Sequence, residues 1–472
     1  MKERKAQMNN SFFKKLGKYS CYGVGAIGLD LSYGLFYSFL SYYLSSLGIH
    51  SAFLLIITPL ARIWDGINDP MMGTVVDNTR TKFGKYRPWI LIGALSNAVV
   101  LALLFTSFGM SGWRLYTYIA VMYILWGMTN TMADIPYWSM VPSFTSEEKE
   151  RNLVATVART FSGLGQGIIT ILTPLIVPKL ASDLEQKTEE GYTPGGFSKW
   201  AIICGICLVI FALICVLTTK ETNVVYGEKK KFSLKQIFSV IKTNDQLGWF
   251  ILFAMLSNAG WYLTSSTAVY YFNDSLGQPK SQSLFGTIGT VGSVLGLLVI
   301  PVLSKKFTKR TTYTISLSTA ILGYALMFVF GPLLKLPLVL SFCYILASVG
   351  ISSMFVSQTI FLADIVDYGE YKNGVRSESI TFSMKGFLQK MAYTIQTVVL
   401  FGGLWIMNYN AQKAANSINS GTKLGIGFVC FGAPIIFLIL SLLVFRKKFK
   451  LYGDLADRVH DYIILKREEE KK

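Results

Sequence analysis

Two carboxylates one helical turn apart are the residues of this sequence best suited to chemistry. Asp65 and Asp69 lie four residues apart in an apolar stretch, so a helix places both on one face, with Arg62 one turn earlier and Asn68 beside them. Two carboxylates this close do not both ionise without help. Either one keeps a proton, or a small hard cation takes their oxygen atoms as ligands. The pair therefore predicts a site for H+ or for a cation such as Na+, with Arg62 as a possible charge partner and no other metal.

A second set of polar residues suits a polyol. Asp134 and Trp138 share one apolar stretch, while Asp30 and Arg159 lie in two others. Sugar hydroxyls form bidentate hydrogen bonds with carboxylate and guanidinium groups, and the apolar face of a sugar ring lies on an aromatic plane. These four residues therefore predict a sugar site. The alternative for Trp138 is packing or a place in an interfacial aromatic belt.

Two basic residues, Lys385 and Lys390, lie in an apolar stretch of the second half. Five residues apart on a helix, their side chains point about 140° from one another. We expect Lys390 to serve a site and Lys385 to snorkel outward or to pair with a charge. A charge at the centre of a membrane helix costs about 2.5–3.5 kcal/mol. Function therefore explains these intramembrane charges better than the alternative, an ion-pair network that only fixes packing.

The composition is that of an integral membrane protein, because 52% of the 472 residues are apolar and only 15% are charged. Residues 1–18 are polar and basic, so we expect no cleavable signal. Apolar runs long enough for about a dozen spans predict an all-α membrane protein with 12 transmembrane helices near residues 20–46, 52–76, 89–109, 115–143, 153–178, 199–219, 246–272, 282–304, 312–332, 336–362, 378–408 and 422–445.

Basic residues sort by side of the membrane. Of the 45 Lys and Arg, 33 lie in the termini and the loops of one side, 8 lie in the loops of the other side, and 4 fall within the spans. This asymmetry predicts a multi-pass protein of the cell membrane with both termini in the cytoplasm. It also explains the net charge of +18 without nucleic acid as a partner.

The predicted helices divide into two sets of six. We expect an N-terminal six-helix bundle over residues 1–219, a cytoplasmic linker over 220–245, a C-terminal six-helix bundle over 246–446 and a cytoplasmic tail over 447–472. The sequence Ala-Asp-Ile at 133–135 recurs at 363–365, and basic loops follow the second and eighth helices at almost the same offset. Two such repeats correspond to the major facilitator fold.

The loop after the second helix resembles the helix 2–3 loop of the major facilitator superfamily. In that pattern an acid can accept hydrogen bonds from basic groups or from a helix N-terminus, and so stabilise one conformation. A generic basic loop is the alternative. The residues expected to act in conformational gating are Asp77, Arg80, Gly84, Lys85 and Arg87.

Cysteine and histidine give no support for catalysis. All six cysteines lie in apolar runs, and the CxxC pair Cys204/Cys207 has no second pair to complete a metal site. With only His50 and His460 available, we expect no enzyme and no resident cofactor.

Four motifs are spread over both halves of the chain: Ala61–Gly73, Gly84–Trp89, Ala133–Pro142 and Asp364–Tyr371. They resemble the motifs of the glycoside–pentoside–hexuronide:cation symporters, the melibiose-permease-like branch of the major facilitator superfamily. The resemblance implies that Asp65 and Asp69 bind the cation with help from Asn68 and Thr131. It assigns Asp30, Asp134, Trp138, Arg159 and Lys390 to the sugar.

This sequence departs from the melibiose permease at two positions. A basic residue before the acid of the first helix is Leu29 here, and a tryptophan of the tenth helix is Phe355. Both departures weaken the expectation of galactoside specificity. The chain ends soon after the last apolar run, so we also expect no appended phosphotransferase-like domain and no regulation by one.

The resemblance implies symport of a sugar with Na+ or H+ by alternating access, and it leaves the sugar and the ion open. The partners expected are a small sugar and membrane lipid, with no obligate protein partner. The sequence leaves two other functions open. One is a carrier of amphiphiles such as lysolipids, and the other is a sugar sensor that does not transport. The density of charged residues in the first half argues against the carrier, and the retained acids argue against the sensor.

Overall fold

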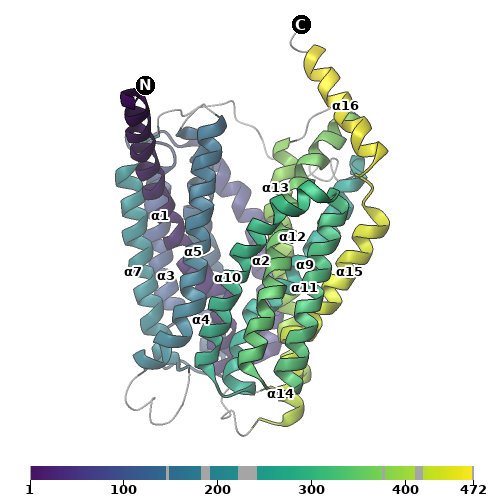
Figure 1. The fold of residues 1–472 in the computed structure, drawn as a ribbon. Helices are drawn as coiled ribbons and strands as arrows, with labels where there is room; N and C mark the ends of the chain where they lie inside the picture. The colour runs from purple at the N-terminus through teal and green to yellow at the C-terminus, as the bar shows by residue number, and fades with distance from the viewer. Residues whose placement is uncertain are drawn as a thin grey trace. The chain divides into compact units, whose positions relative to one another are not determined.

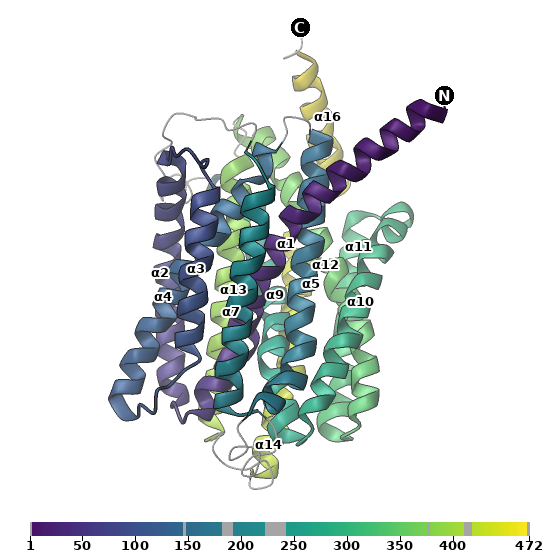
Figure 2. The ribbon, with the colours of Figure 1, turned by 90° about the vertical axis from the view of Figure 1, so that its left-hand side faces the viewer.

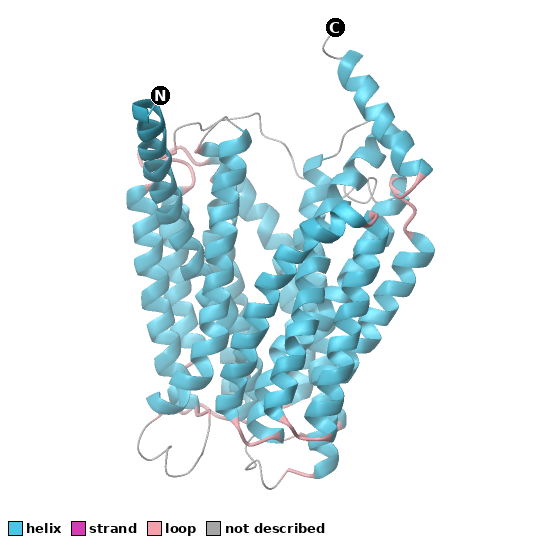
Figure 3. Ribbon diagram, in the orientation of Figure 1, coloured by secondary structure: helices cyan, strands magenta, loops and turns pink. Residues whose placement is uncertain are grey.

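A computed structural model describes residues 2–144, 148–181, 192–221, 242–374, 378–409 and 418–469, and every helix or strand assigned within these ranges is a helix (Figure 3). The predicted all-α class is therefore confirmed. The described residues up to 221 form one compact unit, and those from 242 onward form a second. Most of the predicted linker, 220–245, lies outside the described residues.

The first unit consists of six long helices (Figure 1). A short 3₁₀ turn, Val141–Ser143, follows the fourth helix. Thr193 caps the last helix by accepting the backbone N–H of Gly196 at 3.1 Å. The six are α1 (Lys2–Ser46), α2 (Ser51–Asn78), α3 (Arg87–Leu104), α4 (Gly112–Ser139), α5 (Glu148–Leu180) and α7 (Pro194–Thr218).

The described residues of the second unit also form six long helices, one of which, Ser420–Lys448, contains a π-helical segment, and they add a short C-terminal helix. Three π-helical segments, Tyr271–Ser275, Val329–Leu333 and Phe428–Gly432, extend or join its helices. Its elements are α9 (Asp245–Tyr270), α10 (Pro279–Lys306), α11 (Lys309–Phe328), α12 (Pro337–Asn373), α13 (Glu378–Ile406), α14 (Ser420–Gly427), α15 (Ala433–Lys448) and α16 (Asp454–Glu469).

Nine of the described helical segments are long and apolar enough to cross a bilayer by length and composition alone. The three long helices outside this set are α2, α4 and α13. Their polar side chains lower the mean hydropathy of these helices. The three helices carry Asp65, Asp134 and Lys390, which are residues of the predicted sites. The helices least typical of a membrane span thus carry residues of both predicted sites, while Asp30 and Arg159 of the predicted sugar site lie on two of the nine apolar segments.

Three helices differ clearly from the sequence prediction. α1 begins at Lys2, well before the predicted start near residue 20. α12 continues to Asn373, past the predicted end near 362, because a helix can continue in water after its apolar run has ended. The predicted tail contains α16, which packs Val459 and Ile463 inward and joins α12 through a 2.7 Å ion pair between Lys466 and Glu370.

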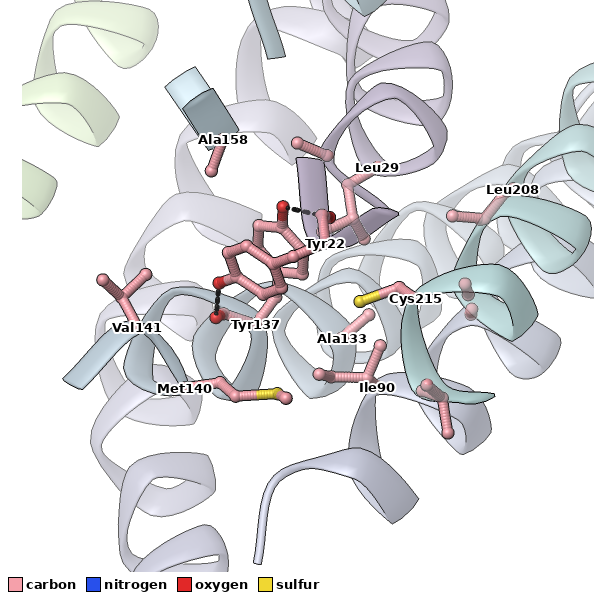
Figure 4. Close-up of a cluster of buried hydrophobic side chains, with 14 of the residues drawn as sticks. Tyr22, Leu29, Ile90, Ala133, Tyr137, Met140, Val141, Ala158, Leu208 and Cys215 are labelled. Atoms are coloured by element: carbon pink, nitrogen blue, oxygen red, sulfur yellow. Dashed lines mark hydrogen bonds between the residues drawn. The ribbon is translucent and has the colours of Figure 1, made fainter. Parts of the chain in front are cut away.

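A stacked tyrosine pair lies in the core of the first unit (Figure 4). The rings of Tyr22 on α1 and Tyr137 on α4 lie 4.4 Å apart and nearly parallel. Each hydroxyl donates to the backbone carbonyl of the other residue. Cys215 of α7 packs in the same cluster, so α1, α4 and α7 share one core around a fully paired polar centre.

Close helix contacts in the first unit depend on glycine. A Cβ added at Gly93 of α3 would lie 2.5 Å from the backbone nitrogen of Ala133 on α4, so no side chain fits there. Figure 2 shows α3 and α4 running together. This contact fixes the position, along the axis of α3, of the α4 segment that carries Asp134.

We expect Gly93→Ala to lower the thermal unfolding temperature of the purified protein, because an overpacked contact costs about 1–3 kcal/mol. The matched control is Gly163→Ala on α5, where an added Cβ meets nothing within 4 Å. Equal unfolding temperatures of the two variants in detergent would show that the α3–α4 contact tolerates a methyl group.

Candidate functional site

The first carboxylate of the acid pair is held by an arginine inside the first unit. Arg62 Nη1 donates to Asp65 Oδ2 at 2.7 Å, and both side chains are buried. The same guanidinium donates to the hydroxyls of Tyr37 at 2.6 Å and Tyr123 at 3.2 Å. Arg62 is thus a partner of Asp65 in the structure, and tyrosines from α1 and α4 complete its surroundings.

Aromatic rings surround this buried cation. The Arg62 Cζ atom lies 4.9 Å from the ring centroid of Tyr37, 5.7 Å from that of Phe36 and 5.8 Å from that of Tyr123. Cation–π attraction is strongest where water is excluded, which offsets part of the cost of burying the charge. The rings and hydroxyls therefore keep the guanidinium beside Asp65.

The second carboxylate faces a hydroxyl on α4. Thr131 Oγ1 donates to Asp69 Oδ1 at 3.1 Å. Asn68 is buried beside it, and its Nδ2 atom has no hydrogen-bond partner among the described residues. The Nδ2 atom is a hydrogen-bond donor and cannot bind a cation, so Asn68 can offer a cation only its Oδ1 atom. The four predicted cation residues thus present carboxylate, hydroxyl and amide groups, whose oxygen atoms suit a hard monovalent cation.

A glycine on α4 makes room for the acid pair, and no pattern in the sequence singled it out. A Cβ added at Gly127 would lie 2.7 Å from Asp65 Oδ1. Gly127 and Thr131 are one turn apart on α4, as Asp65 and Asp69 are on α2. The two helices therefore meet along both carboxylates.

Three of the predicted sugar residues form a contact chain. The Trp138 indole Nε1 donates to Asp134 Oδ1 at 2.9 Å. The Arg159 guanidinium of α5 lies 3.8 Å from the centroid of the Trp138 ring. Asp134 and Trp138 are half-buried, while Arg159 is exposed. A planar cation, an aromatic ring and a carboxylate are therefore aligned, and polar atoms remain accessible for a ligand.

Asp30 of α1 joins this group. Its carboxylate lies beside Ser162 and within Coulombic range of both Asp134 and Arg159. A Cβ added at Gly165 of α5 would lie 3.0 Å from the Asp30 Cβ, so glycine lets α1 and α5 approach at this level. The structure thus brings the four predicted sugar residues of the first unit together.

The lysines of α13 belong to the second unit. Lys390 is half-buried, one turn before Thr394, whose hydroxyl donates to the Lys390 carbonyl at 3.0 Å. Lys385 Nζ donates to Thr359 Oγ1 of α12 at 3.3 Å. Phe355, also on α12, packs edge-to-face against Trp261 at 5.3 Å. Lys385 therefore contacts a neighbouring helix of its own unit.

The loop after α2 is anchored by an acid that the sequence interpretation placed in the linker. Glu221, three residues after α7, accepts the backbone N–H groups of Lys85, Tyr86 and Arg87 at 2.7, 2.9 and 3.0 Å. In return, Arg87 donates through Nε and Nη2 to the Val216 carbonyl at 2.8 and 2.5 Å. We call these reciprocal contacts, made by Glu221 and Arg87, the α3–α7 clamp. Each helix end satisfies backbone groups of the other.

Asp77 and Lys85 pair within the same loop. Lys85 Nζ donates to Asp77 Oδ1 at 2.6 Å. Partial burial alone would lower the pKa of Lys85, but the bond to Asp77 and the nearby Tyr86 outweigh it and raise the pKa. Lys85 is therefore fully charged at neutral pH. Arg80 is exposed on this loop.

Gly84 is required for the clamp on two grounds. Its φ is +106°, a conformation that residues with a side chain rarely adopt. A Cβ there would also lie 2.5 Å from Glu221 Oε1. Glycine at this position thus leaves the space that the Glu221 carboxylate occupies.

Comparison with known proteins identifies the family. The family described as MFS/sugar transport protein matches residues 21–451. This chain belongs to that family. The predicted membership of the melibiose-permease-like symporters is confirmed, as is the expectation of a membrane transporter that is not an enzyme.

Relatives of this chain include proteins named for the transport of lactose, raffinose and isoprimeverose. The chain is 27% identical to a lactose permease of Leuconostoc lactis, over 96% of this chain and 72% of the relative. It is 28% identical to a raffinose carrier protein of Pediococcus pentosaceus, over 92% and 69%. An isoprimeverose transporter of Lactiplantibacillus pentosus is 27% identical, over 89% and 87%.

Solved structures show the same fold. A bacterial homologue of the human lysosomal transporter Spinster aligns with a TM-score of 0.66 at 13% identity, over 94% of this chain and 98% of that one. The nucleoside transporter NupG aligns with a TM-score of 0.64 at 14% identity, over 91% and 99%. At such identities these structures speak for the fold alone, and the predicted major facilitator fold is confirmed.

We expect Gly84→Ala to lower the unfolding free energy by about 2–4 kcal/mol, from backbone strain and weakened hydrogen bonds to Glu221. Gly73→Ala on α2 is the matched control, because a Cβ there meets nothing within 4 Å. Thermal unfolding in detergent compares the two variants. A Gly84→Ala protein as stable as the control would contradict both the backbone strain at this position and the loss of hydrogen bonds to Glu221.

Proposed function

We propose that the chain is a secondary active symporter that carries a glycoside, pentoside or hexuronide together with Na+ or H+ across the cell membrane. Both termini lie on the cytoplasmic side, as the distribution of basic residues indicates. The protein needs no cofactor. The observation that carries the proposal is the chain of contacts from Asp134 through the Trp138 ring to Arg159, with Asp30 beside it, in a member of a sugar-transport family.

The sugar is held by charge and by an aromatic surface. Carboxylates of Asp30 and Asp134 accept hydrogen bonds from sugar hydroxyls, and Arg159 donates to them. The Trp138 ring offers a plane for the apolar face of a sugar. Lys390 is the contribution that we propose for the second unit.

The cation is held by the acid pair. Because Arg62 neutralises Asp65, the group formed by Arg62, Asp65 and Asp69 has a net charge of one negative unit. One monovalent cation balances that charge. With Na+, the oxygen ligands come from Asp69, Thr131, Asn68 and Asp65; with H+, a carboxylate is protonated.

Coupling follows from the position of both sites on α4. Thr131, which bonds Asp69, precedes Asp134 by three residues. A cation that positions Thr131 also positions the sugar carboxylate one turn away. Sugar and cation then raise each other's affinity by the same factor. A change of conformation then exposes the loaded site to the other side of the membrane. The loop residues that gate this change are Asp77, Arg80, Gly84, Lys85 and Arg87.

An amphiphile carrier and a sugar sensor are the competing functions. Uptake of labelled lactose, raffinose or isoprimeverose into proteoliposomes under an imposed Na+ or H+ gradient distinguishes all three. Accumulation driven by a gradient is the expected result. Sugar binding without accumulation under either gradient would indicate a sensor, and the absence of sugar binding would contradict the proposal.

We expect Asp69→Asn to abolish the dependence of sugar affinity on the coupling cation, whether Na+ or H+, while leaving binding of the sugar itself. The amide keeps the shape of the side chain and removes the negative charge that balances the cation. Asp457→Asn on the exposed face of α16 is the control. Calorimetry with and without Na+ and across pH measures the effect, and an unchanged dependence on the coupling cation in Asp69→Asn would remove this residue from the cation site.

We expect Arg159→Lys to weaken sugar binding at least tenfold, which corresponds to about 1.4 kcal/mol. Lysine keeps the charge but lacks the planar fork that stacks on Trp138 and bonds two oxygen atoms at once. The response of the unfolding temperature to Na+ should persist. Arg458→Lys on α16 serves as control, and equal sugar affinity in the two variants would show that charge alone is needed.

A further inference from the structure

We propose that the second unit binds an anionic phospholipid at the membrane surface, beside the C-terminal ends of α10 and α15 and the start of α11. This surface, here called the basic corner, consists of Lys305, Lys306, Arg446, Lys447 and Lys448. All five side chains are exposed. The ligand is a lipid whose headgroup carries a net negative charge, such as phosphatidylglycerol.

Two helices far apart in the sequence contribute to the corner. α10 ends at Lys306, and α11 begins at Lys309, so the ends of these helices are adjacent. Arg310 Nη2 then donates to the Arg446 carbonyl at the end of α15, at 3.0 Å. Figure 1 shows α11 and α15 side by side. The hydrogen bond therefore brings two lysine-rich helix ends together.

The charges of the corner are not neutralised by the protein. In the described part of the chain, none of its five residues forms an ion pair with an acid, whereas Lys309 pairs with Asp364 at 2.8 Å. The corresponding loop of the first unit also pairs one lysine with an acid, Lys85 with Asp77, but it has a second acid, Glu221, which accepts the N–H groups at the start of α3. The start of α11 has the neutral cap Thr308 instead. The general excess of basic residues on one side of a membrane protein does not require this difference between the two units.

Apolar stripes lead into the corner from the membrane. On α15, Ile436, Leu440 and Leu443 are exposed and share one helical face with Lys447. On α10, Val294, Leu298 and Val302 are exposed and share a face with Lys305. Each stripe provides a surface for an acyl chain and ends in a lysine.

An aromatic ring marks the level of the headgroups. Lys448 Nζ lies 5.0 Å from the ring centroid of Trp249, which is half-buried near the start of α9. Tryptophan collects at the membrane–water interface, and basic groups between helices at that level bind anionic headgroups. The basic corner therefore lies at headgroup level, carries positive charge and adjoins apolar helix surface. These three properties fit a phospholipid better than a soluble anion.

The test measures lipid retention by the full-length protein in detergent. Native mass spectrometry and thermal unfolding are recorded with phosphatidylglycerol, with phosphatidylcholine of the same acyl chains, and with inorganic phosphate. We expect phosphatidylglycerol to bind at least tenfold more tightly than phosphatidylcholine and to raise the unfolding temperature, because a ligand stabilises the state that it binds. Inorganic phosphate at the same concentration should leave that temperature unchanged.

The test variant is Lys305→Gln/Lys447→Gln/Lys448→Gln. Its control is Lys280→Gln/Lys335→Gln/Lys423→Gln, which removes three charges at the opposite ends of the helices of the same unit. We expect the first triple to lose at least tenfold in phosphatidylglycerol affinity and the second to keep it. Should the first triple fail to fold, Lys447→Gln alone is expected to show a smaller loss.

Three results would overturn the proposal: an undiminished preference for phosphatidylglycerol in the folded test variant, the same loss in the control, or equal stabilisation by inorganic phosphate. None of these readouts uses a sugar or an ion gradient. A failure of the proposed symport therefore leaves the lipid result independent.

Discussion

The cost of burying charge in a membrane-embedded protein governs the arrangement of the first unit. Arg62 and Asp65 neutralise each other, and tyrosine hydroxyls and rings complete the surroundings of the guanidinium. Asp134 accepts from Trp138, which lies beneath Arg159. Each of these contacts joins different helices or successive turns of one helix. The charged residues therefore determine how α1, α2, α4 and α5 must pack, and the glycines at 127 and 165 provide the space.

The intramembrane residues were predictable because a polar side chain in an apolar run is visible in the sequence itself. Spacing then indicated that Asp65 and Asp69 share a face, and the structure places both against α4. The residues that complete the sites were not predictable. Tyr37, Tyr123 and Gly127 belong to types that are common in any membrane helix, and only the packing of helices brings them to Arg62 and Asp65.

Residues at the helix ends were harder to interpret. Glu221 lies in a charged segment that the sequence predicts to be the start of a linker, and its role depends on the position of the Gly84 loop in space. The charge of residues 447–472 predicts only a tail, yet this segment contains α16, in which Val459 and Ile463 form an apolar face at helical spacing. Asp364 repeats the position of Asp134 in the sequence, yet it pairs with Lys309 beside the loop. A repeated tripeptide thus need not mean a repeated role.

The position of Thr131 and Asp134 on α4 has a consequence for how the protein can change during evolution. Three residues of one α-helix span about 4.5 Å along its axis and cannot move independently. A substitution that shifts α4 to suit a new ion therefore also shifts the carboxylate beside Trp138. With Thr131 serving the ion and Asp134 the sugar, as proposed, ion preference and substrate preference on this scaffold would be inherited together, and a separate change in either one would require residues on other helices.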